Sequence, residues 1–374
     1  MAEKQNTPEI RFEGFTDPWE QRKFSDLTDR VSIQSSDSDL PQVEYEDIVS
    51  GEGTLNKDLH DKEGGKTGIK FYAGDVLYGK LRPYLMNWLY PQFNGVAVGD
   101  FWVLRATECD SSFLYRLVQT DSFQRLANVS TGSKMPRADW NLISQSFFAV
   151  PADYAEQKAI AKSLAELDSL ITLHQRKYDK LCTVKKSMLD KMFPKPGETE
   201  PEIRFEGFTD PWEQRKFLDV VDVCSGKDYK HLKEGSIPVY GTGGFMTSVD
   251  EALSYDRDAV GIGRKGTIDK PYLLKAPFWT VDTLFYAIPK SDIDLEFVHC
   301  SFLNVDWKSK DESTGLPSLS KEAINETLAL VPSFNEQSQL GEFFNNLDSL
   351  ITLHQRKLDL LKNTKKSLLD KMFV

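Results

Sequence analysis

Long apolar runs and paired cysteines are both missing from this chain of 374 residues. No apolar run approaches the roughly 18 residues of a membrane-spanning helix, and the N-terminal MAEKQNTPEI is charged and polar. We therefore expect a cytoplasmic protein without a membrane segment. The four cysteines form no C-x-x-C pair, which argues against a zinc ribbon and a disulfide framework. We expect Cys109, Cys182, Cys224 and Cys300 to be reduced and mostly buried.

Positive charge is in deficit, because the chain has 46 Lys and Arg against 57 Asp and Glu, for a formal net charge of −11. Indiscriminate nucleic-acid binding usually depends on an excess of Lys and Arg, so any contact with DNA must come from local basic patches. Hydrophobic residues make up 40% of the chain and aromatic residues 11%, which is enough apolar material for substantial cores. The length exceeds what one hydrophobic core usually supports, so we expect two or more domains.

The chain carries long internal repeats. PEIRFEGFTDPWEQRKF occurs without change at 8–24 and 201–217, and we call this segment the leading motif. LDSLITLHQRK occurs at 167–177 and 347–357, and SMLDKMF at 187–193 returns as SLLDKMF at 367–373. These repeats define two halves, 8–193 and 201–373. Between the repeats lie two variable regions, about 25–152 and 218–332, that differ in length and almost everywhere in sequence.

The repeated segments near the end of each half have the period of a coiled coil. Apolar residues alternate steps of four and three from Ile160 to Met192 and from Leu340 to Met372, with two polar interruptions in each series. We predict a long helix over 154–192 and an equivalent helix in the second half. Each helix would pair with the other, and the alternative is that each seals the core of its own domain. His174 and His354 lie in these seams, where we interpret them as packing or register residues and not as metal ligands.

Helix ends are marked at both sides of the central junction. Asp153 with Glu156, and Ser333 with Glu336, resemble capping boxes. The prolines of KMFPKPGETEPEIRF at 191–205 predict that the helix ends and a linker begins. Joining Val374 to Met1 would recreate this junction. The organisation is therefore circular, with a pseudo-two-fold relation between the variable regions.

Taken together, these features resemble the specificity subunit of type I restriction-modification systems. The resemblance covers nearly the whole chain. It is carried by the leading motif, the helical block SLAELDSLITLHQRK, the stretch IPVYGTGG at 237–244, and STG followed by a proline at 130–136 and 313–317.

The resemblance implies an α+β fold with two α/β target-recognition domains, separated by two long helices that form an antiparallel coiled coil in a circular, pseudo-two-fold repeat. The expected boundaries are as follows: 1–152 for the first recognition domain with its leading motif, 153–193 for the central helix, 194–200 for the linker, 201–332 for the second recognition domain with its leading motif, and 333–374 for the C-terminal helix.

The resemblance also implies a DNA-specificity function without catalysis. Each variable domain would bind one half of a bipartite, gapped target in double-stranded DNA. The shared helices would set the spacing and dock two modification (methyltransferase) subunits, and restriction (endonuclease and translocase) subunits would then join. No cofactor is expected in this chain, while S-adenosylmethionine, ATP and Mg are expected in the partner subunits.

An enzyme with its own methyltransferase or nuclease activity is the alternative from another class. GIGRKG at 261–266 matches G-x-G-x-x-G, but no helix pattern follows it. GGKT at 64–67 lacks the P-loop glycine, because His60 stands at that position. Glu156-Gln157-Lys158 contains an E-x-K fragment found in nucleases, yet Ser338 replaces the lysine in the second copy. We find no amino-methyltransferase motif. A scaffold without DNA recognition would leave the two different variable regions unexplained.

Candidate DNA contacts are cationic, hydroxyl and aromatic side chains beside glycine-rich turns, where backbone can approach a duplex. For any one of them the simpler interpretation is a solvated hairpin tip. The candidates are Lys80, Arg82 and Tyr84 in GDVLYGKLRPY; Lys134 and Arg137 in STGSKMPRADW; Lys227, Lys230, Tyr240 and Thr242 in GKDYKHLKEGSIPVYGTGG; and Arg264 and Lys265 in GIGRKG.

Aromatic pairs at Phe101-Trp102 and Phe278-Trp279 offer rings that could stack on bases. Core packing is the more frequent role of such residues, and we predict it here.

Overall fold

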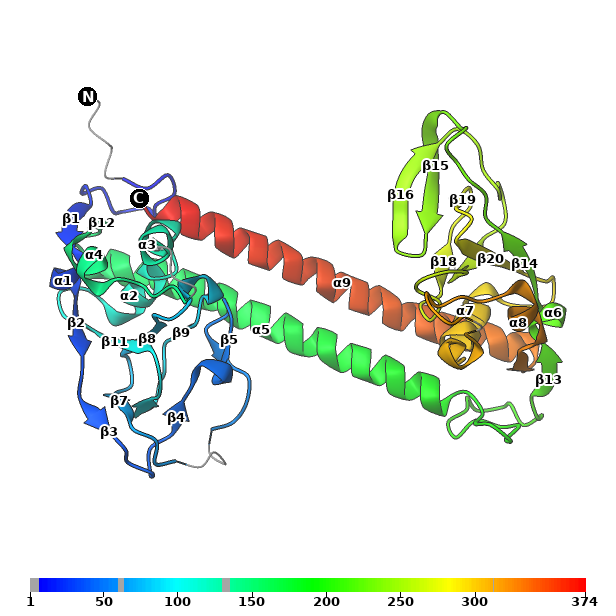
Figure 1. Ribbon diagram of the computed structural model, residues 1–374, viewed down its shortest axis with the longest axis horizontal. Coiled ribbons are helices and arrows are strands. Elements are labelled where there is room, and N and C mark those ends of the chain that lie inside the picture. The colour runs from blue at the N-terminus through cyan, green and yellow to red at the C-terminus, as the bar shows by residue number, and fades with distance from the viewer. Residues whose placement is uncertain (1–6, 60–63, 130–134, 312) are drawn as a thin grey trace. The chain divides into compact units, whose positions relative to one another are not determined.

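The computed structural model describes residues 7–59, 64–129, 135–311 and 313–374, with element labels as in Figure 1. The chain divides into two compact units. Unit 1 comprises Met1–His174 and Lys357–Val374, and unit 2 comprises Gln175–Arg356. Each unit therefore contains one variable region and a part of both long helices.

The long helices are α5, Tyr154–Lys191, and α9, Phe334–Met372. Their heptad positions are buried or half-buried throughout, which confirms the predicted seam. In unit 1, Lys365 Nζ lies 2.7 Å from Asp168 Oδ1, and in unit 2, Lys185 Nζ lies 2.6 Å from Asp348 Oδ1. From the first pair to the second, the residue number rises along α5 by as much as it falls along α9. Both pairs therefore belong to one antiparallel register. Each lysine that interrupts the apolar heptad series thus forms an ion pair with the other long helix.

Unit 1 carries mainly antiparallel sheets, with one parallel pair between β10 and β4. The strand orders are β2-β11-β8-β9, β3-β7-β10-β4, β1-β12 and β5-β6. The elements before α5 are β1 Glu20–Lys23, α1 Phe24–Leu27, β2 Thr28–Val31, β3 Gln34–Ser35, β4 Gln42–Val43, η1 Tyr45–Asp47, β5 Ile48–Val49, β6 Thr54–Leu55, β7 Gly68–Phe71, β8 Val76–Gly79, η2 Pro83–Leu85, β9 Trp88–Leu89, β10 Gly95–Ala97, β11 Phe101–Ala106, α2 Ser111–Leu117, α3 Asp121–Ala127, α4 Trp140–Gln145 and β12 Phe147–Val150.

Unit 2 has the same two-stranded and four-stranded antiparallel sheets as unit 1, but its remaining strands, which we call its periphery, are arranged differently. Its strand orders are β14-β20-β17-β18, β16-β15-β19 and β13-β21. The elements between α5 and α9 are β13 Glu213–Lys216, α6 Phe217–Val220, β14 Val221–Ser225, β15 Glu234–Gly241, β16 Gly244–Val249, β17 Ala259–Gly263, β18 Tyr272–Leu274, β19 Trp279–Thr280, β20 Leu284–Pro289, α7 Leu295–Leu303, η3 Trp307–Lys310, α8 Lys321–Glu326 and β21 Leu328–Val331.

The long helices pair with each other and also complete the two hydrophobic cores. The sequence offered helix pairing and core sealing as alternatives, and the structure shows both. Ile160 and Leu164 at the start of α5 belong to the core of unit 1. Phe373, just after the end of α9, enters the same core and stacks on Phe113 at 5.3 Å between ring centroids. In unit 2, Phe193 after the end of α5 stacks in the same way on Phe297, at 5.9 Å.

The leading motif clasps the start of the long helix in the same way in both units. Arg11 donates to both carboxylate oxygens of Glu156 at 2.6 and 2.8 Å, and Trp19 Nε1 donates to Glu156 Oε1 at 3.2 Å. Arg204 and Glu336 repeat these bonds at 2.7 and 2.8 Å. The predicted capping boxes are therefore wrong in one part: Asp153 caps α5 by accepting from the Ala155 amide, whereas Glu156 turns into the protein.

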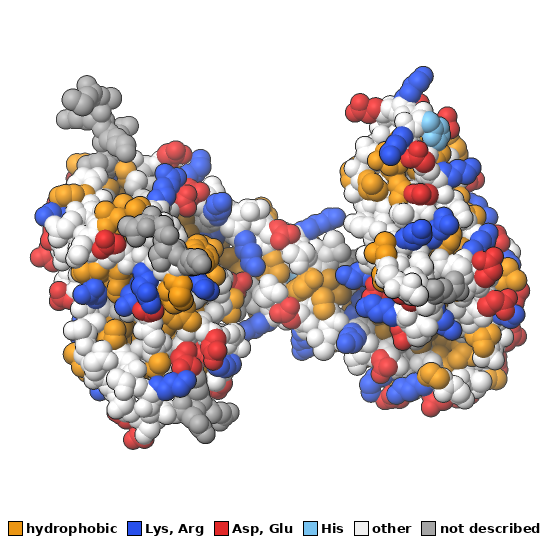
Figure 2. Space-filling model, viewed as in Figure 1, with side chains coloured by type: hydrophobic (Ala, Val, Ile, Leu, Met, Phe, Trp, Pro, Cys, Tyr) orange, Lys and Arg blue, Asp and Glu red, His pale blue; other side chains and the backbone are white. Residues whose placement is uncertain are grey.

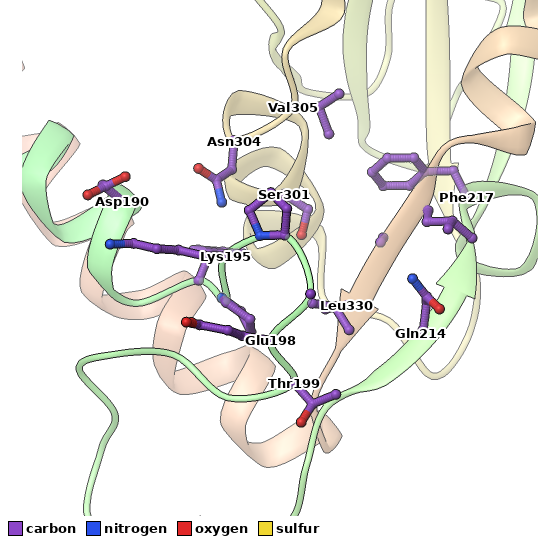
Figure 3. A pocket seen from close by; sticks show the side chains of 16 residues that line it. Asp190, Lys195, Glu198, Thr199, Gln214, Phe217, Ser301, Asn304, Val305 and Leu330 are labelled. Atoms are coloured by element: carbon purple, nitrogen blue, oxygen red, sulfur yellow. The ribbon is translucent and has the colours of Figure 1, made fainter.

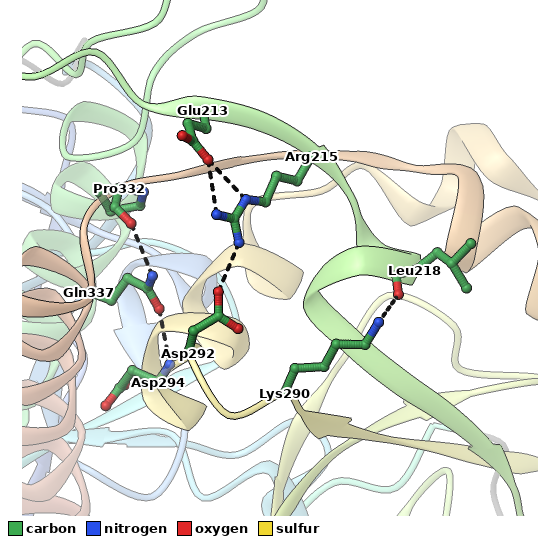
Figure 4. A network of polar contacts seen from close by, with 8 residues as sticks. All are labelled: Glu213, Arg215, Leu218, Lys290, Asp292, Asp294, Pro332 and Gln337. Carbon is green, nitrogen blue, oxygen red and sulfur yellow. Dashed lines mark hydrogen bonds and ion pairs between the residues drawn. The ribbon is translucent and has the colours of Figure 1, made fainter.

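Gln157 and Gln337 follow these glutamates and bind backbone. Figure 4 shows Gln337 accepting from the Asp294 amide at 3.0 Å and donating to the Pro332 carbonyl at 3.0 Å. Gln157 makes the equivalent bonds to Asp110 and Pro151 in unit 1. The repeated Glu-Gln pair is thus a structural joint, because it ties the helix to both the leading motif and the variable region.

The circular organisation is visible in two backbone hydrogen bonds. The Ile203 amide donates to the Lys191 carbonyl at 2.9 Å, immediately across the linker. The Ile10 amide donates to the Lys371 carbonyl at 3.0 Å, although no linker joins these segments. In the described part of the chain, no helix is both long and apolar enough to cross a membrane.

Candidate nucleic-acid interface

In unit 1 the candidate cations gather at the loop after β8. The Arg82 amide donates to the Pro136 carbonyl at 2.7 Å, and the Ala138 amide donates to the Lys80 carbonyl at 2.8 Å. These bonds frame an antiparallel bridge between Leu81 and Arg137. Chain segments more than 50 residues apart are thereby held together, and they bring Lys80, Arg82 and Arg137 to one place.

Asp100 orients two of these cations. Its carboxylate lies 3.0 Å from Arg137 Nη2 and 3.5 Å from Lys80 Nζ. Partial burial alone would raise the pKa of Asp100, but the hydrogen bond from Arg137 and the positive charges of Arg137 and Lys80 outweigh it, so the pKa is lowered. Asp100 thus stays ionised and positions both side chains. Asp100 was not among the candidates from the sequence, because its pairing with Lys80 and Arg137 depends on the fold.

Arg82 and Tyr84 are exposed beside this cluster. Arg82 has φ of 49°, a left-handed conformation that is uncommon for residues other than glycine. Lys134 and His60 lie outside the described residues.

The loop after β17 in unit 2 has the same backbone arrangement. The Gly266 amide donates to the Pro317 carbonyl at 2.8 Å, and the Leu319 amide donates to the Arg264 carbonyl at 2.9 Å. A bridge joins Lys265 to Ser318. Gly266 occupies the position of Arg82 and also has positive φ, at 91°. We call these two equivalent places the proline-anchored loops.

The side chains on this second loop are exposed. Arg264 lies over the Phe285 ring at 5.7 Å, and its Nη1 donates to the Asp282 carbonyl at 3.3 Å. Both candidate cations line a cavity of about 340 Å³ with serines and Lys321. The serines and Lys321 were not among the candidates from the sequence, although the run SLSK directly follows Pro317. The lining comprises Ser225, Arg264, Lys265, Phe285, Ser318, Leu319, Ser320, Lys321 and Glu322.

Two of the four remaining candidates of unit 2 lie beside β19. The Lys227 amide donates to the Thr280 carbonyl, and Tyr240 pairs with Thr280 in the parallel β15–β19 ladder. Thr242 lies in the turn between β15 and β16, while Lys230 is exposed further along the loop after β14. The structure therefore brings Lys227 and Tyr240 together. No hydrogen bond or ion pair between described residues joins these four to Arg264 or Lys265.

Several motifs have structural roles only. GIGRKG runs from β17 into the proline-anchored loop, without the helix that a dinucleotide site needs. Glu156 of the E-x-K fragment is clasped by Arg11 and 1% exposed. Trp102 and Trp279, with Phe101 and Phe278, are buried, as predicted for core residues.

Among the described residues, no group of three or more His, Cys, Asp or Glu side chains is arranged so that it could hold a metal ion. The four cysteines are free, with Cys109 and Cys300 buried and the other two half-buried.

Figure 3 shows the larger cavity of unit 2, about 670 Å³, between the linker, β13 and α7. Linker residues Lys195 and Glu198 form one wall and Ser301 and Asn304 of the α7 end form another. None of the candidate cations lines it. The space-filling view in Figure 2 shows basic and acidic side chains interspersed over the visible surface. The local basic loops are therefore the sites to consider, in keeping with the acidic net charge.

The chain thus consists of two units built on one duplicated scaffold, each with a cationic loop and a different periphery. Residues 209–363 match the family model described as the type I restriction modification DNA specificity domain. The specificity subunit of the type I restriction enzyme MjaVIII from Methanocaldococcus jannaschii is 23% identical over 299 residues, which cover 70% of this chain and 68% of that protein. The specificity subunit of EcoDI from Escherichia coli is 26% identical over 155 residues, or 40% of this chain and 34% of that protein.

Solved structures agree in fold. The S subunit of a type I restriction-modification system from M. genitalium superimposes with a TM-score of 0.66 at 17% identity, over 98% of this chain and 99% of that chain. A second structure, from work on complex assembly and conformational transition of the type I R-M system, gives 0.54 at 16% identity, with coverage of 98% and 99%. By sequence and by fold, the chain is similar to type I restriction-modification specificity subunits. This similarity supports a role in DNA sequence specificity.

Proposed function

We propose that this chain reads a bipartite DNA target, in which each variable region, about 25–152 and 218–332, binds one half. The observation that carries the proposal is the pair of proline-anchored loops. Two regions with different sequences hold exposed cations on the same backbone frame: Arg82 and Arg137 in unit 1, Arg264 and Lys265 in unit 2. A common frame with different side chains suits two readers of different half-sites.

The periphery of unit 2 supports a reader distinct from that of unit 1. In the three-stranded sheet β16-β15-β19, strands β15 and β16 form an antiparallel two-stranded ribbon, with Phe245 and Met246 exposed on β16 and Thr242 at the turn; β19 pairs only with Val239 and Tyr240 of β15. The major groove of B-DNA is wide enough for such a ribbon. The first variable region has instead the β3-β7-β10-β4 sheet. Different surfaces predict different bases in the two half-sites.

The shared helices are proposed to dock two methyltransferase subunits and to set the gap between half-sites. Leu170 and Leu173 of α5 are exposed, and so are Leu350 and Leu353, their equivalents in α9. Identical exposed leucines in two copies of one segment suit two copies of one partner. Restriction subunits would join this complex, and S-adenosylmethionine, ATP and Mg would be bound by the partners. Such an assembly would act in the cytoplasm.

The test is a half-site exchange. The target is first selected from random duplexes with the full chain, alone and with its methyltransferase subunits. Residues 25–152 are then replaced by the variable region of another family member, and the selection is repeated. We expect one half of the target to change while the other half and the gap persist. A change in both halves would contradict independent readers, and the absence of any selected sequence would contradict the proposed function.

A control addresses the enzymatic alternative. The purified chain, supplied with Mg, ATP and S-adenosylmethionine, should neither cleave nor methylate DNA. Robust activity in a preparation free of other subunits would overturn the assignment of catalysis to the partners.

A further inference from the structure

The proline-anchored loops share one feature that the reading of different half-sites does not require. The residue directly before the anchoring proline is large, apolar and exposed in both units: Met135 is 47% exposed and Leu316 is 67% exposed. The two variable regions differ almost everywhere else in sequence. An exposed apolar side chain at the same place on two divergent surfaces indicates a task common to both.

The backbone fixes the position of this side chain. The carbonyl of the following proline accepts a bond of 2.7 Å from Arg82 in unit 1 and of 2.8 Å from Gly266 in unit 2. The residue after the proline forms a bridge to the segment that follows β8, at Leu81, or β17, at Lys265. A residue before proline is also confined to extended conformations. The backbone that carries the apolar tip is therefore anchored before any ligand arrives.

Exposed cations lie on the same loops as the tip. Arg82 and Arg137 are exposed in the unit 1 loop, and Arg264 and Lys265 in the unit 2 loop, where Lys321 lines the same cavity. An apolar partner protein would give these cations nothing to neutralise, whereas a DNA duplex offers phosphates to the cations and base edges or base steps to the tip. Leucine, methionine and proline are among the residues that DNA-bending proteins insert between base pairs.

We propose that Met135 and Leu316 are apolar wedges that partly unstack one base step in each half-site. The proposal rests on the DNA-recognition function proposed above. It adds base unstacking, a task that does not depend on the base sequence of the DNA. Because both units carry the wedge while their other exposed side chains differ, the wedge supplies affinity and DNA distortion in both half-sites. The neighbouring cations and the periphery of each unit supply the base preference.

The experiment uses the full chain and its selected duplex, with 2-aminopurine placed in turn along both half-sites. Unstacking raises the fluorescence of this base. We expect one bright position in each half-site. Leu316→Ala should abolish the bright position on its own side only, and Met135→Ala the other one. Each variant should bind about ten-fold more weakly, comparable to the loss of one buried leucine contact. The selected sequence should stay the same.

Leu360→Lys is the matched control. Leu360 is exposed on α9, and Lys180 holds the equivalent position in α5, so this change should leave both fluorescence and affinity unaltered. Melting temperatures verify that each variant folds.

Selective binding without a bright position in either half-site would overturn the wedge and leave the proposed function intact. A change of the selected bases in Met135→Ala or Leu316→Ala would also overturn it, since these residues would then be base readers. A wild-type chain that selects no sequence would instead contradict the proposed function itself.

Discussion

Arg82 combines an unfavourable backbone with an exposed charge. A left-handed conformation costs a residue with a Cβ about 1–2 kcal/mol, and unit 2 places a glycine at the same position. We predict that Arg82→Gly stabilises the chain by up to about 1 kcal/mol, since glycine's greater freedom when unfolded offsets part of the relief. The same variant should bind DNA more weakly. Urea unfolding and duplex titration measure the two effects.

Arg82→Ala separates these effects, because alanine keeps the Cβ and removes only the guanidinium. It should bind DNA as weakly as Arg82→Gly and gain no stability. Equal DNA binding by wild type and both variants would mean that Arg82 lies away from the duplex.

Glu156 is the buried end of the clasp in unit 1, and its hydrogen bond to Arg11 raises the pKa of that guanidinium. Glu156→Gln removes the charge while preserving size. We predict a loss of about 2 kcal/mol of unfolding free energy, as is typical for a hydrogen bond between charged groups. Glu336→Gln should cost a similar amount, since its bonds repeat those of Glu156.

Glu166→Gln serves as the control for this measurement, because Glu166 is exposed on the same helix. A loss as large as that of Glu156→Gln would attribute the effect to helix charge and not to the clasp.

Among the elements, the two long helices have their register marked by ion pairs. Lys185 Nζ contacts both oxygens of Asp348, at 2.6 and 2.8 Å, inside unit 2. We predict that Lys185→Asp and Asp348→Lys each destabilise the chain and that the double exchange restores about 1 kcal/mol. A double-mutant cycle by urea unfolding measures this coupling energy. Additive losses, with no restoration, would show that the pair does not select the register.

The heptad pattern predicted these helices and their ends well because it is local: each apolar position follows from its neighbours three and four residues away. Sequence periodicity could not show that the last residues after each helix enter a core. Phe193 and Phe373 do so because their partners, Phe297 and Phe113, lie more than 100 residues away in the chain.

At the scale of the whole molecule, the repeat is circular. The bond from Ile10 to Lys371 reproduces the bond from Ile203 to Lys191, with the linker 194–200 present only in the second case. We predict that a permuted chain folds, in which PKPGETE joins Phe373 to Pro8 and new ends open inside 194–200. Its melting temperature should lie within a few degrees of the parent, because every clasp and ion pair is retained.

A permutant opened inside α7 is the comparison, because it interrupts a helix with buried residues on all sides. We expect it to lose most of its stability. If both permutants fail alike, the junction in unit 1 is not equivalent to that in unit 2.

By itself the sequence determined the two-fold duplication, the long helices, the linker and the burial of the aromatic pairs, because each follows from repetition or from local pattern. The sequence also identified the candidate cations of both proline-anchored loops. Only the tertiary structure decided that Glu156 binds Arg11 of the leading motif instead of capping α5, and that Arg82 takes positive φ. It also decided that Met135 and Leu316 lie at equivalent places in the two proline-anchored loops. Those outcomes depend on hydrogen bonds such as Arg11 to Glu156, 145 residues apart. Partners so distant leave no periodic trace, so geometry reveals them only after the chain has folded.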